Sequence, residues 1–219
     1  MPSRRRKQPV IERLVRRIFY KYYARNLLYE LQIRARAEAA DYVQGNMCNA
    51  VILEDPVELY RFAVGRAESQ GLFLEFGVAG GDSINVIAGL VDGQVHGFDS
   101  FNGLPEDWRG HVEVHSAFSR NGKSPPVAPN VTLHTGPFVE IIPEFKRRHN
   151  AAVSLLHIDC DLYNSTRDVL RGLEDRIRPG TIILFDEYFN YPGWKHHEFK
   201  AWQEFVAEHK VSYDYLAIS

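Results

Sequence analysis

The chain is poor in cysteine, with only Cys48 and Cys160 among its 219 residues. Two cysteines cannot build a disulfide framework or a zinc site of their own, so we expect a reduced, intracellular setting. No apolar run approaches the roughly 20 residues of a membrane-spanning helix. The basic N-terminus also lacks the uninterrupted apolar stretch and cleavage site of a secretory signal. These absences predict a cytoplasmic protein.

The chain also lacks a strong net charge, because 26 basic residues nearly balance 28 acidic ones. A net charge of −2 does not point to nucleic acid as a partner. The balance hides an asymmetry, since residues 1–36 hold eleven Lys and Arg against Glu12 and Glu30. The remainder carries 15 basic and 26 acidic residues, so a basic arm precedes an acidic body.

Within the arm, proline and glycine are absent from Val10 to Ala40, and apolar residues such as Leu14 and Ile18 recur at helical spacing. This pattern predicts an amphipathic helix with at most one break. A basic amphipathic helix can lie on an anionic membrane. We favour instead an accessory helix that covers the active site or pairs with a second subunit in a homodimer. Such helices more often bury their apolar face in protein.

Beyond the arm, short apolar segments alternate with amphipathic ones. This alternation predicts an α/β fold with a mostly parallel, twisted sheet and helices on both faces. The predicted strands are residues 72–76, 94–98, 131–134, 153–158, 181–185 and 211–218. The predicted helices are residues 56–69, with Asp55 as N-cap, and then 83–90, 139–148, 165–177 and 197–209.

A glycine-rich turn follows the first predicted strand, with Glu75, Gly77, Ala79 and Gly81 at alternate positions. Small residues suit a sharp backbone turn that a ligand must approach closely, and the next helix offers free N–H groups. Asp99 ends the next strand, at about the offset where an acidic residue meets ribose hydroxyls in doubly wound folds. Asp99 by itself fits a turn or cap residue equally well. Together these features indicate a nucleoside-binding site.

Acidic pairs follow the fourth and fifth predicted strands: Asp159 with Asp161, and Asp186 with Glu187. Ligands of open parallel sheets bind outside the carboxyl ends of the strands, so both pairs fall at that edge. Four converging carboxylates repel one another unless a cation or protons intervene, and Mg²⁺ suits such oxygen ligands. The alternative is that some of them cap the following helices. We favour that for Asp161 more than for Asp159 or Asp186.

Two further segments are candidates for substrate contact. His196 or His197, after the second acidic pair, fits an acid/base or substrate-binding role, although a solvated bystander is as common. The stretch of residues 101–130 is long for a connection inside a domain. We expect either a lid over the substrate or a surface excursion.

Four extended motifs stand out: Glu75-Phe-Gly-Val-Ala-Gly-Gly-Asp-Ser83, Gly97-Phe-Asp-Ser-Phe-Asn-Gly-Leu-Pro105, Asp159-Cys-Asp-Leu-Tyr-Asn-Ser-Thr166 and Arg178-Pro-Gly-Thr-Ile-Ile-Leu-Phe-Asp-Glu-Tyr188. They resemble the macrocin O-methyltransferase family. The resemblance implies a Rossmann-like class I methyltransferase fold, S-adenosylmethionine and Mg²⁺ as cofactors, and a sugar or natural-product hydroxyl as acceptor. We therefore expect a helical arm of accessory helices at residues 1–45 and a methyltransferase domain at 46–219.

The resemblance also implies roles for single residues. Asp159 or Asp161 is the candidate base. His196 is a further catalytic candidate by its place after the second acidic pair, in a stretch that differs from the macrolide enzymes. The implied metal ligands are Asp159, Asp186 and Glu187, where the family more often has two aspartates at the last two positions. The implied cofactor-binding residues are Glu75, Gly77, Ala79, Gly81, Ser83, Asp99, Ser100, Gly136, Phe138 and Asp159.

Class I enzymes end in an antiparallel hairpin, of which residues 211–218 provide one strand.

Two other functions remain open. A nicotinamide-dependent oxidoreductase would use the same glycine turn, although the chain lacks room for a second nucleotide-binding half. A module that docks on a membrane or partner through residues 10–40 would leave the acidic pairs without a role.

Overall fold

The computed structural model describes residues 10–219. Five parallel strands form its main sheet in the order β4-β3-β2-β5-β6. The chain starts at the centre of this sheet, moves outward to β4 and then crosses back to β5. The order therefore reverses between β2 and β5, which is where ligands bind in doubly wound sheets. The strands are β2 (Leu72–Phe76), β3 (Val95–Asp99), β4 (Val131–Thr135), β5 (Val153–Ile158) and β6 (Ile182–Phe185).

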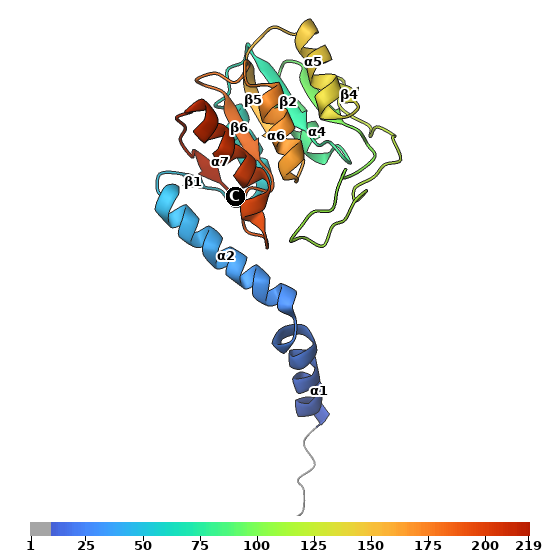
Figure 1. The fold of residues 1–219 in the computed structure, drawn as a ribbon, viewed down its shortest axis with the longest axis vertical. Coiled ribbons are helices and arrows are strands. Elements are labelled where there is room, and N and C mark those ends of the chain that lie inside the picture. The colour runs from blue at the N-terminus through green and yellow to red at the C-terminus, as the bar shows by residue number, and fades with distance from the viewer. Residues whose placement is uncertain (1–9) are drawn as a thin grey trace, which may run out of the picture.

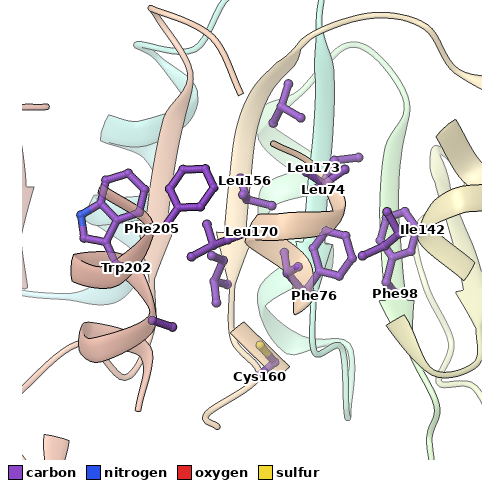
Figure 2. Packing of buried hydrophobic residues seen from close by; sticks show 14 of the residues in the cluster. Leu74, Phe76, Phe98, Ile142, Leu156, Cys160, Leu170, Leu173, Trp202 and Phe205 are labelled. Atoms are coloured by element: carbon purple, nitrogen blue, oxygen red, sulfur yellow. The ribbon is translucent and has the colours of Figure 1, made fainter. Parts of the chain in front are cut away.

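Helices cover both faces of the sheet (Figure 1). On one face, α3 (Pro56–Val64) and α4 (Asp82–Leu90) pack against β2, β3 and β5 through one apolar cluster. A larger cluster fills the other face, where Phe76 and Phe98 stack with ring centroids 4.4 Å apart (Figure 2). That face is covered by α5 (Phe138–Arg148), α6 (Tyr163–Gly172) and α7 (Glu198–His209), the last preceded by the short helix η2 (Trp194–His196).

Burial of the central strands on both faces explains their nearly continuous apolar sequence. In β2, Phe73 enters one cluster while Leu74 and Phe76 enter the other. Against this background, Glu75 in β2 and His157 in β5 are fully buried polar residues, each with 0% exposure. Buried charged groups require partners, so these two positions direct attention to the carboxyl ends of the central strands.

The N-terminal arm contains two helices, α1 (Val10–Phe19) and α2 (Leu27–Asn46), joined by the π-helical turn η1 (Tyr20–Ala24). The prediction of helical structure with at most one break agrees with this interruption after η1, and Asn26 caps α2 by accepting a hydrogen bond from the Tyr29 backbone N–H at 3.1 Å. The arm extends away from the body (Figure 1). Within residues 10–219, no helix has both the length and the apolarity needed to cross a bilayer.

The prediction of a strand over residues 211–218 is wrong in extent. Only β7 (Ala217–Ile218) is a strand, and it pairs in parallel with β1 (Val51–Ile52) outside the main sheet. Residues before it are held by side chains instead, because the Tyr215 hydroxyl lies 2.6 Å from that of Tyr42 and 2.7 Å from that of Tyr188. Within the described residues, the main sheet therefore contains no antiparallel strand.

Candidate active site

The glycine turn and both acidic loops lie side by side at the switch point of the sheet. The parallel hydrogen-bond ladder continues one residue beyond each strand. The Asp159 N–H donates to the Phe76 carbonyl at 2.9 Å, and the Asp186 N–H donates to the Ile158 carbonyl at 3.0 Å. The ends of β2, β5 and β6 are therefore in register, which brings together the segments expected to bind cofactor and metal.

Gly77 is the point of closest approach between the glycine turn and the first acidic loop. Its φ of +90° lies in the left-handed region, and a Cβ built there would lie 1.7 Å from the Asp159 carbonyl oxygen. Only glycine fits this position without displacing the backbone. The two loops therefore pack backbone to backbone, which fixes the position of Asp159 relative to the turn.

Asp99 holds the glycine turn in shape. One oxygen of its carboxylate accepts hydrogen bonds from the backbone N–H groups of Val78 and Ala79, both at 2.8 Å, and the other accepts from the Phe101 N–H at 2.7 Å. These bonds support the positive φ of Ala79, +40°. A structural role of this kind was the alternative considered for Asp99, and its ribose contact stays a prediction.

Beneath the turn, Glu75 forms a buried pair with His157. The Glu75 Oε2 atom lies 2.9 Å from His157 Nδ1, and Glu75 Oε1 accepts a hydrogen bond from the Ser83 hydroxyl at 3.0 Å. Burial alone would lower the pKa of His157, but the hydrogen bond and charge of Glu75 outweigh it, so that pKa is raised. His157 Nε2 is buried and has no hydrogen-bond partner among the described residues.

Three side chains at this edge have potential metal-ligand atoms within 4.8 Å of one another: His157, Asp159 and Asp186. The structure thus brings together two of the three predicted ligands. Glu187 does not belong to this group, and His157 stands in its place. Assignment of metal ligands stays a prediction, with Asp159 and Asp186 supplying its carboxylates.

Glu198, at the start of α7, joins the two acidic loops. Its side chain is fully buried and accepts hydrogen bonds from the Asp161 N–H at 3.1 Å and the Glu187 N–H at 3.2 Å. Burial, followed by the nearby charge of Asp161, raises its pKa well above the ordinary value. The sequence pattern did not single out Glu198. The feature that could have identified it is a carboxylate in the first turn of the helix that follows the second acidic loop.

Asp161 and Glu187 both titrate near neutrality. Burial, together with the charge of Glu187, raises the pKa of Asp161 to about 7. Burial and then Asp186 raise the pKa of Glu187 to about 7 as well. A carboxylate whose pKa is near the working pH is suited to general acid/base catalysis.

The long segment of residues 101–130 packs against the loop that carries His196 and His197. Trp108 from this segment and Trp194 from η2 are both buried in one apolar cluster. His197 is buried, its pKa is lowered by that burial, and its Nε2 lies 2.7 Å from the Arg109 carbonyl oxygen. The segment is thus a packed cover next to the acidic loops. His196 is exposed.

The remaining predicted residues lie around Asp99. The Gly136 N–H donates to the Asp99 carbonyl at 3.1 Å, and Ser100 accepts a hydrogen bond from the Asn102 N–H at 3.2 Å. The Phe138 ring packs edge-on against Phe76, with centroids 5.2 Å apart. These residues share the edge formed by β2, β3 and β4, whereas their contacts with a cofactor stay predictions.

Residues 74–188 match a protein family described as a methyltransferase domain. The match spans more than half of the chain, so the chain belongs to this family. The prediction of a methyltransferase enzyme that uses S-adenosylmethionine is confirmed at this level. No curated protein matches the chain significantly.

Solved structures agree on the fold. The calicheamicin methyltransferase CalS11 is similar with a TM-score of 0.57 and 18% identity, over 91% of this chain and 84% of that one. The O-methyltransferase NovP has a TM-score of 0.51 and 23% identity, over 71% of this chain and 72% of its own. The predicted Rossmann-like methyltransferase fold is therefore confirmed.

Proposed function

We propose that this methyltransferase transfers the methyl group of S-adenosylmethionine to a hydroxyl of a sugar or another natural-product small molecule. The observation that carries the proposal is the convergence of the glycine turn with two acidic loops at the switch point of the sheet. Family membership supports methyl transfer, and the four motifs that resemble macrocin O-methyltransferases support oxygen as the acceptor atom. NovP is named as an O-methyltransferase and CalS11 as a methyltransferase of calicheamicin, and both names are compatible with the proposal.

The cofactor lies, in this proposal, across the ends of β2, β3 and β4. Its methionine end meets the turn, its ribose meets Asp99 and Ser100, and its adenine lies near Gly136 and Phe138. The close packing of Gly77 on Asp159 supports this arrangement, because it sets the glycine turn directly beside the acidic loop. Residues of the turn that complete the proposed contact are Glu75, Gly77, Ala79, Gly81 and Ser83.

Mg²⁺ is the proposed metal, held by Asp159 and Asp186, with Glu187 as the third proposed ligand. The two carboxylates fit a divalent cation, since Mg²⁺ prefers oxygen ligands, and His157, Asp159 and Asp186 offer potential ligand atoms within 4.8 Å of one another. If bound there, Mg²⁺ would lower the pKa of the acceptor hydroxyl, as metals do for bound water. Asp161 or Asp159 takes the proton of that hydroxyl, and the packed cover of residues 101–130 excludes water.

A cavity of about 460 Å³ beside β6 supports a small-molecule acceptor. This volume is within the ~300–1,000 Å³ of typical ligand pockets. Its wall includes Tyr60 from α3, Asp186 and Glu187 from the second acidic loop, and Tyr215 from the C-terminal segment. Of the proposed metal ligands, Asp186 and Glu187 line this cavity and Asp159 does not, so in this proposal the cavity leads an acceptor toward the site from the side of β6.

Two measurements test the function. Calorimetry with S-adenosylhomocysteine and NAD side by side separates methyl transfer from nicotinamide chemistry, and we expect binding of the first only. Methyl transfer from labelled S-adenosylmethionine to a panel of hydroxylated acceptors is then measured with Mg²⁺ or chelator. Asp159→Ala removes the activity in our proposal, whereas Asp168→Ala, which alters an ion pair on α6, retains it. Undiminished transfer by Asp159→Ala would overturn the metal role.

A further inference from the structure

An uncovered apolar face runs along α1. Apolar residues recur there at three- and four-residue spacing and therefore share one side of the helix. Ile11 is 75% exposed, Leu14 56% and Ile18 45%. Every residue of α1 whose burial is described is exposed, so the body does not cover this face. A soluble protein rarely leaves such a continuous apolar surface without a binding partner.

Basic side chains occupy the rest of the helix surface. At 100° per residue, Arg13, Arg16 and Arg17 fall opposite or beside the apolar stripe. Lys21 and Arg25 continue the series, and the sequence adds Arg4, Arg5, Arg6 and Lys7, which lie outside the described residues. Residues 10–25 hold one acidic residue, Glu12. A cluster of about 4–8 Lys and Arg on an amphipathic helix is characteristic of binding to anionic lipid.

Aromatic side chains are concentrated at the end of α1 and in η1. Tyr20, Tyr22 and Tyr23 are each about half exposed, and Phe19 is 55% exposed. The ring of Tyr22 lies 5.1 Å from Lys21 Nζ. Aromatic rings with a polar end favour the boundary between lipid headgroups and acyl chains. Their exposure next to basic groups matches the chemistry of that boundary.

We propose that α1 and η1 bind the surface of an anionic membrane, with the apolar stripe at the level of the upper acyl chains and the basic side chains among the headgroups. A second copy of the arm is a poorer partner, because pairing would bring like charges together. The apolar face is also wider than the narrow seam of a coiled coil. This inference goes beyond the proposed methyl transfer and does not depend on it.

Flotation of the full chain with phosphatidylcholine vesicles, with and without phosphatidylglycerol, tests the proposal. We expect the chain to float with the anionic vesicles and to remain behind with the neutral ones. Replacing Arg13, Arg16 and Arg17 by Gln weakens partition on the order of a hundred-fold, from roughly five-fold per basic side chain. Added salt weakens it in the same direction.

Leu14→Glu with Ile18→Glu removes the apolar contribution and abolishes flotation. The matched control is Val112→Glu with Val114→Glu, which places the same substitutions at two exposed valines of the body and leaves flotation intact. Circular dichroism confirms that each variant is folded. Light scattering without lipid tests the competing partner, a second copy of the arm, because it measures whether the chain is a dimer. Failure of the unmodified chain to float overturns the proposal. If that chain is a dimer that Leu14→Glu with Ile18→Glu dissociates, the second copy is the partner of α1 instead. Loss of flotation in the control variant to the same extent also overturns the proposal.

Discussion

The arm and the carboxyl edge of the sheet use the same kinds of residue in opposite ways. In the body, apolar side chains such as Phe76 are buried, and the ionisable Glu198 accepts hydrogen bonds from backbone groups of neighbouring loops. In α1, the apolar and basic side chains whose burial is described are exposed. The body therefore covers its own apolar surface, whereas α1 leaves its apolar surface uncovered.

The largest expected effect is the loss of stability when Gly77 is substituted, with Gly45 for comparison. Gly77→Ala places a Cβ against the Asp159 carbonyl at a left-handed φ, whereas Gly45 in α2 has nothing within 4 Å of its Cβ position. We expect Gly77→Ala to destabilise the fold by more than ~4 kcal/mol, or to prevent folding. Gly45→Ala should stabilise α2 by ~0.5–1 kcal/mol. Urea unfolding checks both, and tolerance of Gly77→Ala would contradict the close packing.

The next largest effect is a dependence of stability on pH that arises from His96 in β3, which is 6% exposed. Burial, then the charges of His134 and His149, lowers its pKa to about 4. Between the ordinary value of ~6.5 and 4, only the unfolded chain takes up the proton, so stability is lost as pH falls. The expected loss is at most about 3 kcal/mol.

His96→Phe should remove this loss, and the exposed His115→Phe should not. The measurement is the free energy of unfolding of each variant and of the wild type as a function of pH. The raised pKa values of Asp161 and Glu187, each about 7, act in the opposite direction, because these groups gain protons on folding as pH falls from 7. Parallel curves for His96→Phe and wild type would contradict the assignment.

A smaller effect is expected at Glu198. Glu198→Ala leaves the buried N–H groups of two acidic loops without their acceptor, which costs about 2 kcal/mol. Glu204→Ala on the same helix removes an exposed carboxylate that accepts one hydrogen bond, from the Tyr163 hydroxyl at 2.6 Å, and should change the free energy of unfolding by about 1 kcal/mol or less. Equal values for the two variants would show that Glu198 does not hold the loops.

The smallest effect belongs to the contact between arm and body. Lys195 Nζ and Glu38 on α2 form an ion pair at 2.7 Å, with both side chains about half exposed. Such pairs contribute roughly 0.5 kcal/mol or less. A double-mutant cycle with Glu38→Gln and Lys195→Gln measures the coupling. A coupling well above ~1 kcal/mol would contradict the view of this pair as a solvent-exposed contact.

Sequence analysis predicted the sheet well because strands buried on both faces have apolar runs that local pattern reveals. It placed Asp159 and Asp186 at one edge, since parallel strands end on the same side. Asp55 as the N-cap of α3 was also confirmed, by a 2.9 Å hydrogen bond from the Glu58 N–H. These features depend on residues close together in sequence.

What the sequence did not reveal depends on contacts between distant segments. Glu198 and His157 became recognisable only when burial left them among the acidic loops. Residues 211–216 alternate like a strand, yet they form no ladder, and the Tyr215 hydroxyl instead bonds to the hydroxyls of Tyr42 and Tyr188. The apolar stripe of the arm was visible in the sequence, but its exposure was not.

The pairing of β1 with β7 ties the start of the body to its end. Val51 and Leu53 donate their N–H groups to Leu216 and Ile218 at 2.9 and 2.8 Å. Contacts so far apart in sequence form late in folding, because the intervening chain must first be ordered. During synthesis the arm emerges first, yet its attachment to the body through β1 is complete only when the last residues arrive. The connection of α2 to the body through β1 is therefore completed late in folding.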